Sequence, residues 1–275
     1  MTRRALARHG LGIFGGCVSV LVVLVALLAP WLAPHDPIAS NFAESLKPPG
    51  TPGYPLGTDQ LGRDLLSRVL YGARIALFIG FCTVGLTAVV GGLLGLLAGF
   101  HEGWAGAALM RLADVQLSFP FILLALTINA IVGLGLRNII ISLSAAGWVV
   151  YARVVRGEVL SVKRREYVQA AAALGTGRAR LLLRHVLPNV APSIAVVASL
   201  QFSQFVVAEA AISFLGFGVQ PPTPAWGSML SESRDFLYVA WWLAAFPGAA
   251  LALTALGVNL VGDWLRDVLD PKLRV

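Results

Sequence analysis

The sequence predicts an all-α integral membrane protein with six transmembrane helices, because it is very apolar and divides into long apolar runs. Of its 275 residues, 57% are hydrophobic and only 13% are charged, and the mean hydropathy is +0.77. Soluble domains carry about twice that share of charged residues. A helix needs about 20 largely apolar residues to cross the hydrocarbon core of a bilayer. Several segments approach or exceed that length.

The apolar runs define the expected spans. They cover residues 11–32, 74–100, 117–133, 138–153, 193–216 and 239–261. The fourth run is the least regular, because it is short and ends among basic residues. Arg111 and Asp114 stand three residues apart at the start of the third span. Side chains at this spacing share a helix face, so we expect a local ion pair that anchors the helix.

The basic residues orient these spans. With the N-terminus inside, the inside segments carry 15 of the 21 Lys and Arg residues, and the outside keeps Lys47, Arg63, Arg68, Arg74, Arg137 and Arg234. Basic residues concentrate on the cytoplasmic side of membrane proteins, so both termini and the loop 153–192 are expected in the cytoplasm. In a soluble protein the net charge of +7 would suggest nucleic-acid binding. Here the topology accounts for it, and no nucleic-acid partner is expected.

The first span is expected to remain in the mature protein as a signal-anchor helix. Three arginines precede it, but its apolar run is longer than a signal-peptide core and has no A-x-A cleavage site. Two parts follow along the chain. Residues 1–73 hold one helix and a polar, proline-rich external segment. Residues 74–275 hold the other five spans, the loop 153–192 and a short cytoplasmic tail.

The external segment contains a regular pattern at residues 57–68. Thr58 or Asp59 could cap a short helix there. Its apolar face, at helical spacing, would carry Leu61, Leu65, Val69 and Leu70. This helix would lie in the external membrane interface, just before the second span.

The loop 153–192 is the most informative part of the chain. Residues 166–175 include four consecutive alanines. An alanine run has high helix propensity and little side-chain bulk, so another protein could approach its backbone closely. Gly175 is well placed to end that helix, and residues 178–187 predict a second short helix closed by Pro188. The alternative is a solvated basic loop that binds nothing.

This loop resembles the coupling loop of ABC importer permeases. That motif reads E-A-A, three residues, Gly, nine residues, an apolar residue, one residue, then Leu-Pro. Gly175 stands six residues after Gln169, and Leu187 and Pro188 follow at the expected spacing. Gln169 replaces the glutamate of the motif, and His185 replaces its apolar residue. Glu166 offers a carboxylate one helical turn before Gln169.

Three further stretches narrow the resemblance to one branch of these permeases. Residues 57–68 match the signature G-T-D-x-x-G-R-D-x-x-S-R, which is typical of the C-type permease of dipeptide, oligopeptide and nickel importers. Residues 209–227 and the stretch 111–120 agree with the same branch. The resemblance covers nearly the whole chain and implies the type I importer permease fold, with a cytoplasmic coupling helix.

The resemblance also implies partners. A second homologous permease and two cytoplasmic ATPase subunits, which would bind ATP and Mg, are expected with an extracytoplasmic substrate-binding protein in a bacterial inner membrane. Closure of the ATPases would rock the spans, which contact membrane lipid, between outward and inward access. The implied coupling residues are Glu166, Tyr167, Gln169, Ala170, Ala171, Gly175, Leu187, Pro188 and Asn189. Di- and oligopeptides are the expected substrates, while nickel complexes and some oligosaccharides remain open.

Polar residues inside the spans are candidates for the transport pathway. Glu209 is costly at membrane depth, so it would either face the pathway or serve as a hydrogen-bonded structural carboxylate. Gln201 and Gln204 lie three apart on one helix face. They could contact the backbone of a peptide or bond neighbouring helices. Asn129 could likewise contact a peptide or bond a neighbouring helix, and the bond between helices is favoured.

No catalytic constellation is present in the sequence. It contains no H-E-x-x-H, G-x-S-x-G or C-x-x-C motif and no G-x-x-x-x-G-K-[ST] phosphate loop. The chain is therefore expected not to be an enzyme, and ATP would be bound by other chains. The competing class is a self-sufficient secondary transporter or channel. That class needs ionisable residues in several spans and usually inverted repeats, whereas Glu209 is the one clear intramembrane acid.

Overall fold

The predicted all-α membrane fold is confirmed by the computed structural model, which describes residues 3–101 and 103–269. Within these ranges every regular element is a helix, apart from two isolated β-bridges in the segment before α2. Five helices are long and apolar enough to cross a membrane, and a bent pair of helices could form a sixth span. The five long helices are α1 (Arg3–Leu32), α2 (Leu65–Phe100), α5 (Leu136–Lys163), α8 (Leu187–Phe214) and α10 (Trp242–Leu269).

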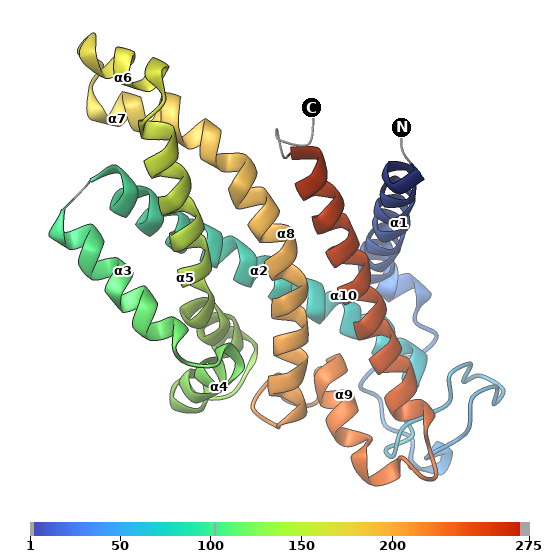
Figure 1. Ribbon diagram of the computed structural model, residues 1–275. Coiled ribbons are helices and arrows are strands. Elements are labelled where there is room, and N and C mark those ends of the chain that lie inside the picture. Colours follow the sequence, from blue (N-terminus) through green and yellow to red (C-terminus); the bar gives the residue numbers. More distant parts are fainter. Residues whose placement is uncertain (1–2, 102, 270–275) are drawn as a thin grey trace.

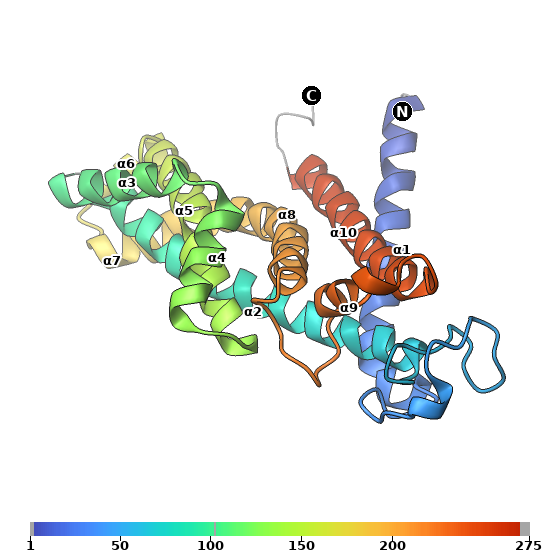
Figure 2. The same cartoon turned by 90° about the horizontal axis from the view of Figure 1, so that it is seen from below.

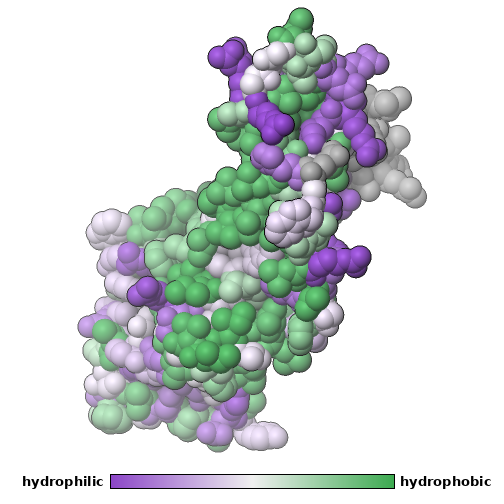
Figure 3. Space-filling model, turned by 90° about the vertical axis from the view of Figure 1, so that its left-hand side faces the viewer, coloured by the Kyte–Doolittle hydropathy of each residue, from purple (hydrophilic) through white to green (hydrophobic). Residues whose placement is uncertain are grey.

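The two ends of the molecule carry different elements. The start of α1 and the end of α10 lie at one end, together with α6 (Glu166–Ala173) and α7 (Arg178–Arg180) (Figure 1). The loop between α1 and α2 and helix α9 (Trp226–Glu232) lie at the other end. Hydrophobic side chains form a band between the two ends on the face shown in Figure 3, and hydrophilic ones gather near α6 and α7. This banding is the pattern of a membrane-spanning protein.

The long helices form two groups joined by α2. Seen from below, α3 (Trp104–Leu117), α4 (Phe121–Val132) and α5 lie on one side, whereas α1 and α10 lie on the other (Figure 2). Helix α2 crosses between the groups, and α8 lies between them. This arrangement leaves α8 in contact with both groups, so it is central to the molecule.

The prediction that the third span is a single helix over residues 117–133 is wrong. The chain forms α3 and α4, which are bent by 96° at a short break. Pro120 stands at the N-cap of α4, where its missing N–H costs nothing, and it disfavours a helical conformation at the residue before it. Helix α4 alone has 12 residues, too few to cross a bilayer.

Two helices extend beyond their predicted limits. Helix α2 begins at Leu65 because the Asp64 carboxylate accepts the amide N–H of Ser67 at 2.9 Å. The short helix expected to start at residue 58 is therefore wrong, and the expected boundary after residue 73 falls inside α2. Helix α5 continues to Lys163, so the loop begins about three helical turns later than predicted.

Pro188 does not end a helix, contrary to the prediction. The chain stays helical from Arg178 to Phe214, through a π-helical turn, η2 (Leu181–Val186). In a regular α-helix the proline ring would press on the carbonyl four residues earlier. The wider turn relieves this contact: the Leu187 amide donates to the Leu182 carbonyl, five residues back.

Helices α2 and α5 pack closely through glycines. Gly91, Gly95 and Gly99 recur every four residues, so they share one face of α2. A Cβ atom at Gly95 would lie 2.9 Å from Cα of Ala152, and one at Gly99 would lie 2.8 Å from Cβ of Val159. The small residues of α2 therefore let the two backbones approach, as is common between membrane helices.

Candidate functional site

Helix α6 ends as its sequence predicts. Gly175 has φ +82°, and the Thr176 amide donates to the Ala171 carbonyl at 3.1 Å. The Gly175 amide donates to the Ala172 carbonyl at 3.0 Å. These two bonds are the Schellman arrangement, which favours glycine because the left-handed backbone conformation costs it little. The chain turns back sharply here, so α6 stands as a short, separate helix at one end of the molecule.

One face of α6 packs against the spans. Val168 is only 2% exposed and lies in an apolar cluster with Val159 of α5 and Leu181 and Val186 of η2. Ala171, three residues later, also packs against this cluster. The exposed residues are Glu166, Tyr167, Gln169, Ala170, Ala172, Ala173, Leu174 and Gly175. The surface of α6 away from the spans is therefore open to another protein.

A small polar network holds α6 against the start of α8. The Asn189 side-chain amide donates to the His185 carbonyl at 2.8 Å, and the Arg165 guanidinium donates to the Asn189 side-chain oxygen at 3.2 Å. The rings of Tyr167 and His185 lie 6.5 Å apart, centroid to centroid. His185, at the apolar position of the motif, thus contacts α6 through its ring. Leu187 packs against the apolar cluster below.

Gln204 is the predicted pathway residue that faces a cavity. The cavity has a volume of about 560 Å³ and lies between α4, α8 and α10. Its walls include Phe121, Leu200, Ser203, Gln204, Val207 and Asn259. Gln204 is exposed, whereas Gln201 is buried and does not line this cavity. The two glutamines therefore have different surroundings despite their shared spacing.

Glu209 is buried within the end of α8 and the turn that follows. Its side chain is 2% exposed, and one carboxylate oxygen accepts the Ser213 hydroxyl at 2.6 Å. The Ser213 oxygen in turn accepts the Val219 amide at 3.1 Å. The carboxylate is thus hydrogen-bonded within its own helix, and it orders the segment between α8 and α9.

Asn129 connects three segments. Its amide nitrogen donates to the Phe217 carbonyl, and its oxygen accepts the Ser142 hydroxyl at 3.3 Å. Asn129 belongs to α4, Ser142 to α5 and Phe217 to the loop after α8. Its side chain is fully buried, so these bonds satisfy a polar group that would be costly to leave unpaired.

Asp114 pairs with Arg153 of α5, so the predicted local pair with Arg111 is wrong. The next polar residue on α3, Gln116, accepts the indole N–H of Trp148 at 3.1 Å. Helix α3 lies along α5, so Arg153 on α5 competes with Arg111 on α3 for the Asp114 carboxylate. These contacts join α3 to α5.

A buried charge network at the opposite end of the molecule was missed by the sequence reasoning. Arg63 contacts Asp59 at 2.5 Å and Glu232 at 2.8 Å. Arg68 contacts the same two carboxylates at 3.4 and 3.1 Å. The arginine side chains are at most 4% exposed. We call these four residues the external charge network.

The external charge network fastens the loop before α2 to the α9 region. Two indole N–H groups reinforce it: Trp226 donates to the Val69 carbonyl at 3.0 Å, and Trp242 donates to the Thr58 carbonyl at 3.2 Å. The charged residues of the motif at 57–68 were the only signal in the sequence. Nothing in that motif identified α9 as the partner.

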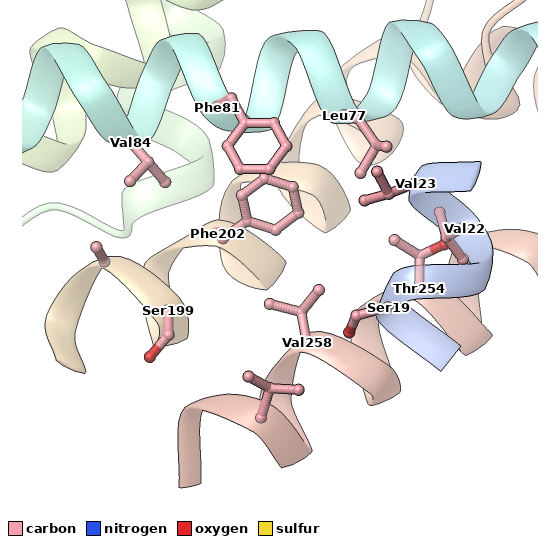
Figure 4. A pocket seen from close by; sticks show the side chains of 12 residues that line it. Ser19, Val22, Val23, Leu77, Phe81, Val84, Ser199, Phe202, Thr254 and Val258 are labelled. Carbon is pink, nitrogen blue, oxygen red and sulfur yellow. The ribbon is translucent and has the colours of Figure 1, made fainter. Parts of the chain in front are cut away.

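A second cavity, almost entirely apolar, lies on the other side of α8. It has a volume of about 290 Å³ and lies between α1, α2, α8 and α10 (Figure 4). The rings of Phe81 and Phe202 meet in its wall with their centroids 4.8 Å apart, with Val84 and Leu77 on either side. Its lining side chains differ from those of the cavity beside Gln204, which include the amides of Gln204 and Asn259.

Comparison with known proteins agrees with this architecture. The family of binding-protein-dependent transport system inner membrane components matches residues 91–275, and the N-terminal TM domain of oligopeptide transport permease C matches residues 1–49. The di/tripeptide transport system permease protein DppC of Pseudomonas aeruginosa is 46% identical over 97% of this chain and 90% of its own length. The dipeptide transport system permease protein DppC of Alkalihalophilus pseudofirmus is 39% identical over 98% and 89%. The glutathione transport system permease protein GsiD of Pectobacterium atrosepticum is 40% identical over 99% and 90%.

The fold, the separate helix α6 and these matches define a permease subunit of an ABC importer. The chain belongs to the family of binding-protein-dependent transport system inner membrane components, in the C-type branch of the dipeptide, oligopeptide and nickel importers. It is a multi-pass protein of the inner membrane and a non-catalytic subunit.

Proposed function

We propose that this chain imports di- and oligopeptides as one of two permease subunits of an ATP-driven transporter. The second permease is homologous, two cytoplasmic ATPase subunits bind ATP and Mg, and an extracytoplasmic binding protein delivers the substrate. The printed names of the relatives, which are permeases for dipeptides, di/tripeptides and glutathione, support the substrate class. The observation that carries the proposal is the exposed face of α6, which is rich in alanine and stands apart from the spans.

This exposed face is the docking surface for an ATPase subunit. Ala170, Ala172 and Ala173 offer methyl groups only, so a cleft on the ATPase can close around the helix. Leu174 is 87% exposed at the end of the same helix, which supports an apolar contact that is buried only in the complex. Glu166, Tyr167 and Gln169 supply the polar contacts around it.

Motion of α6 passes to α5 and α8. Val168 and Ala171 belong to one apolar cluster with residues of α5, η2 and α8, and packed interiors transmit displacement because they contain little free volume. Arg165 and Asn189 join the turn before α6 to the start of α8. Gly175 shapes the turn after α6, and Leu187 and Pro188 shape the entry into α8. ATPase closure would therefore rock the spans between outward and inward access.

Affinity purification in mild detergent, with the chain tagged and expressed with its native neighbours, tests the proposal. The expected result is recovery of a second permease and of ATPases that carry a phosphate loop. Their ATP turnover should rise when a peptide and its binding protein are added. A chain that purifies alone and moves solute in ATP-free vesicles would contradict the proposal and favour a secondary transporter.

A further inference from the structure

The cavity beside Gln204 contains three uncharged polar side chains at one place. The Ser203 hydroxyl donates to the Asn259 side-chain oxygen at 2.5 Å, and Gln204 adjoins Ser203 on α8. Asn259 belongs to α10, so two spans contribute to the group. The walls around it include Phe121, Leu200 and Val207. We call Ser203, Gln204 and Asn259 the amide site.

The amide site is not suited to face lipid. Gln204 and Asn259 are exposed in the single chain, and hydrocarbon offers no hydrogen-bond partner to a polar group. Among the described residues, the amide of Gln204 has no hydrogen-bond partner, and neither has the amide nitrogen of Asn259. An unpaired amide in an apolar medium is costly, because it has given up its hydrogen bonds to water. These groups therefore require water or a polar ligand.

We propose that the amide site is where the transported peptide contacts this subunit, through hydrogen bonds to a backbone amide. This inference rests on the proposed function and gives it a location. A carboxamide donates and accepts at once, as does a peptide group. None of the side chains that line the cavity is charged, so the site does not select for substrate charge. The apolar walls accept side chains of varied shape, which suits a permissive transporter.

Helix α8 itself provides a matched control for this site. Ser199 lies one turn before Ser203, and its hydroxyl donates to the Val196 carbonyl at 2.8 Å, whereas the Ser203 hydroxyl donates to Asn259. Ser199 lines the apolar cavity, whereas Ser203 lines the cavity that contains Gln204 and Asn259. Changing either serine to alanine removes the same group, but only Ser203→Ala removes a contact with Asn259.

The test uses the whole transporter in vesicles and two substrates. One is trialanine, and the other is an analogue in which one ester replaces an amide, so that one N–H donor is lost. Both are delivered on saturated binding protein.

We expect the wild type to move trialanine about tenfold faster than the ester analogue, because the loss of about one hydrogen bond has an effect of that size. Gln204→Leu and Asn259→Leu should each reduce this ratio of rates below about threefold. Each variant lacks a side-chain amide that would bond the peptide, so the loss of the peptide N–H has little further effect. Ser203→Ala should reduce the ratio, and Ser199→Ala should leave it unchanged.

Three results would overturn the inference. If the wild type moves trialanine and the variants retain the wild-type ratio of rates between the two substrates, the amide site is not in the pathway. Peptide import itself would then stand. If Gln204→Leu or Asn259→Leu no longer co-purifies with the second permease, the group is a contact between subunits. If the wild type moves neither compound under ATP, the proposed peptide import fails and the amide site fails with it.

Discussion

The guanidinium of Arg63 donates a hydrogen bond of 2.8 Å to the carboxylate of Glu232, 169 residues further along the chain. Arg68 donates to the same oxygen atom at 3.1 Å. Glu232 thus shares with Asp59 the compensation of two buried arginines, and it joins the loop before α2 to α9. Because a buried charge without a partner is costly, this end of the molecule depends on Glu232.

Glu232→Gln should destabilise the protein. The substitution keeps the shape of the side chain but removes the charge that faces Arg63 and Arg68, and breaking a buried ion pair costs about 3–5 kcal/mol. Glu232 is partly exposed, so we expect the lower part of that range. The unfolding midpoint in a detergent titration measures the effect. Glu44→Gln breaks a more exposed pair with Lys47 and should cost less than about 1 kcal/mol. Equal midpoints for the two variants would contradict the role of Glu232.

Gly175→Pro should abolish recovery of the ATPases while leaving the chain in the membrane. Proline cannot adopt φ +82°, and it removes the amide that donates to Ala172. Gly177 has φ −60°, which proline favours. Gly177→Pro should therefore retain the ATPases. Co-purification from equal amounts of membrane measures both variants. Normal recovery with Gly175→Pro would contradict the docking role of α6.

Glu209→Gln should impair transport only mildly. The glutamine oxygen can accept the Ser213 hydroxyl as the carboxylate does, so the turn after α8 keeps its order. Glu209→Leu removes that acceptor and should reduce the amount of folded protein, because a buried hydroxyl then loses a partner. Uptake of one cationic and one neutral peptide measures the role of the charge. A large change in the ratio of their rates with Glu209→Gln would place Glu209 in the pathway instead.

Gly95→Ala should destabilise the pair of helices α2 and α5. The new methyl group would lie 2.9 Å from Cα of Ala152, and overpacking of this kind costs about 1–3 kcal/mol. Gly85 lies on the same helix, and a Cβ atom there would meet nothing within 4 Å. Gly85→Ala should be neutral or stabilise the helix by up to about 1 kcal/mol. Thermal unfolding in detergent compares the two variants. A loss of stability as large with Gly85→Ala would point to a general effect of alanine in α2.

Features that depend on neighbouring residues could be predicted from the sequence. The alanine run and Gly175 determine where α6 ends, because the bonds that close it lie within six residues. The apolar runs predicted the membrane class, since hydrophobic length requires no knowledge of partners. The motif spacing around Gln169 and Leu187 led to the family for the same reason.

Contacts between distant segments decided what the sequence left undetermined. Asp114 could pair with an arginine on its own helix or on another, and the packing of α3 along α5 brought Arg153 to it. Pro188 is a strong helix breaker in isolation, yet the π-turn and the packing of Leu187 carry the helix through it. The position of Asn259 beside Ser203 also has no local cause. By itself, then, the sequence determined the membrane class, the family and the short helix α6, because these follow from hydrophobicity, motif spacing and local propensity. Tertiary structure decided the partners of the polar groups, because a buried hydrogen bond depends on which spans meet.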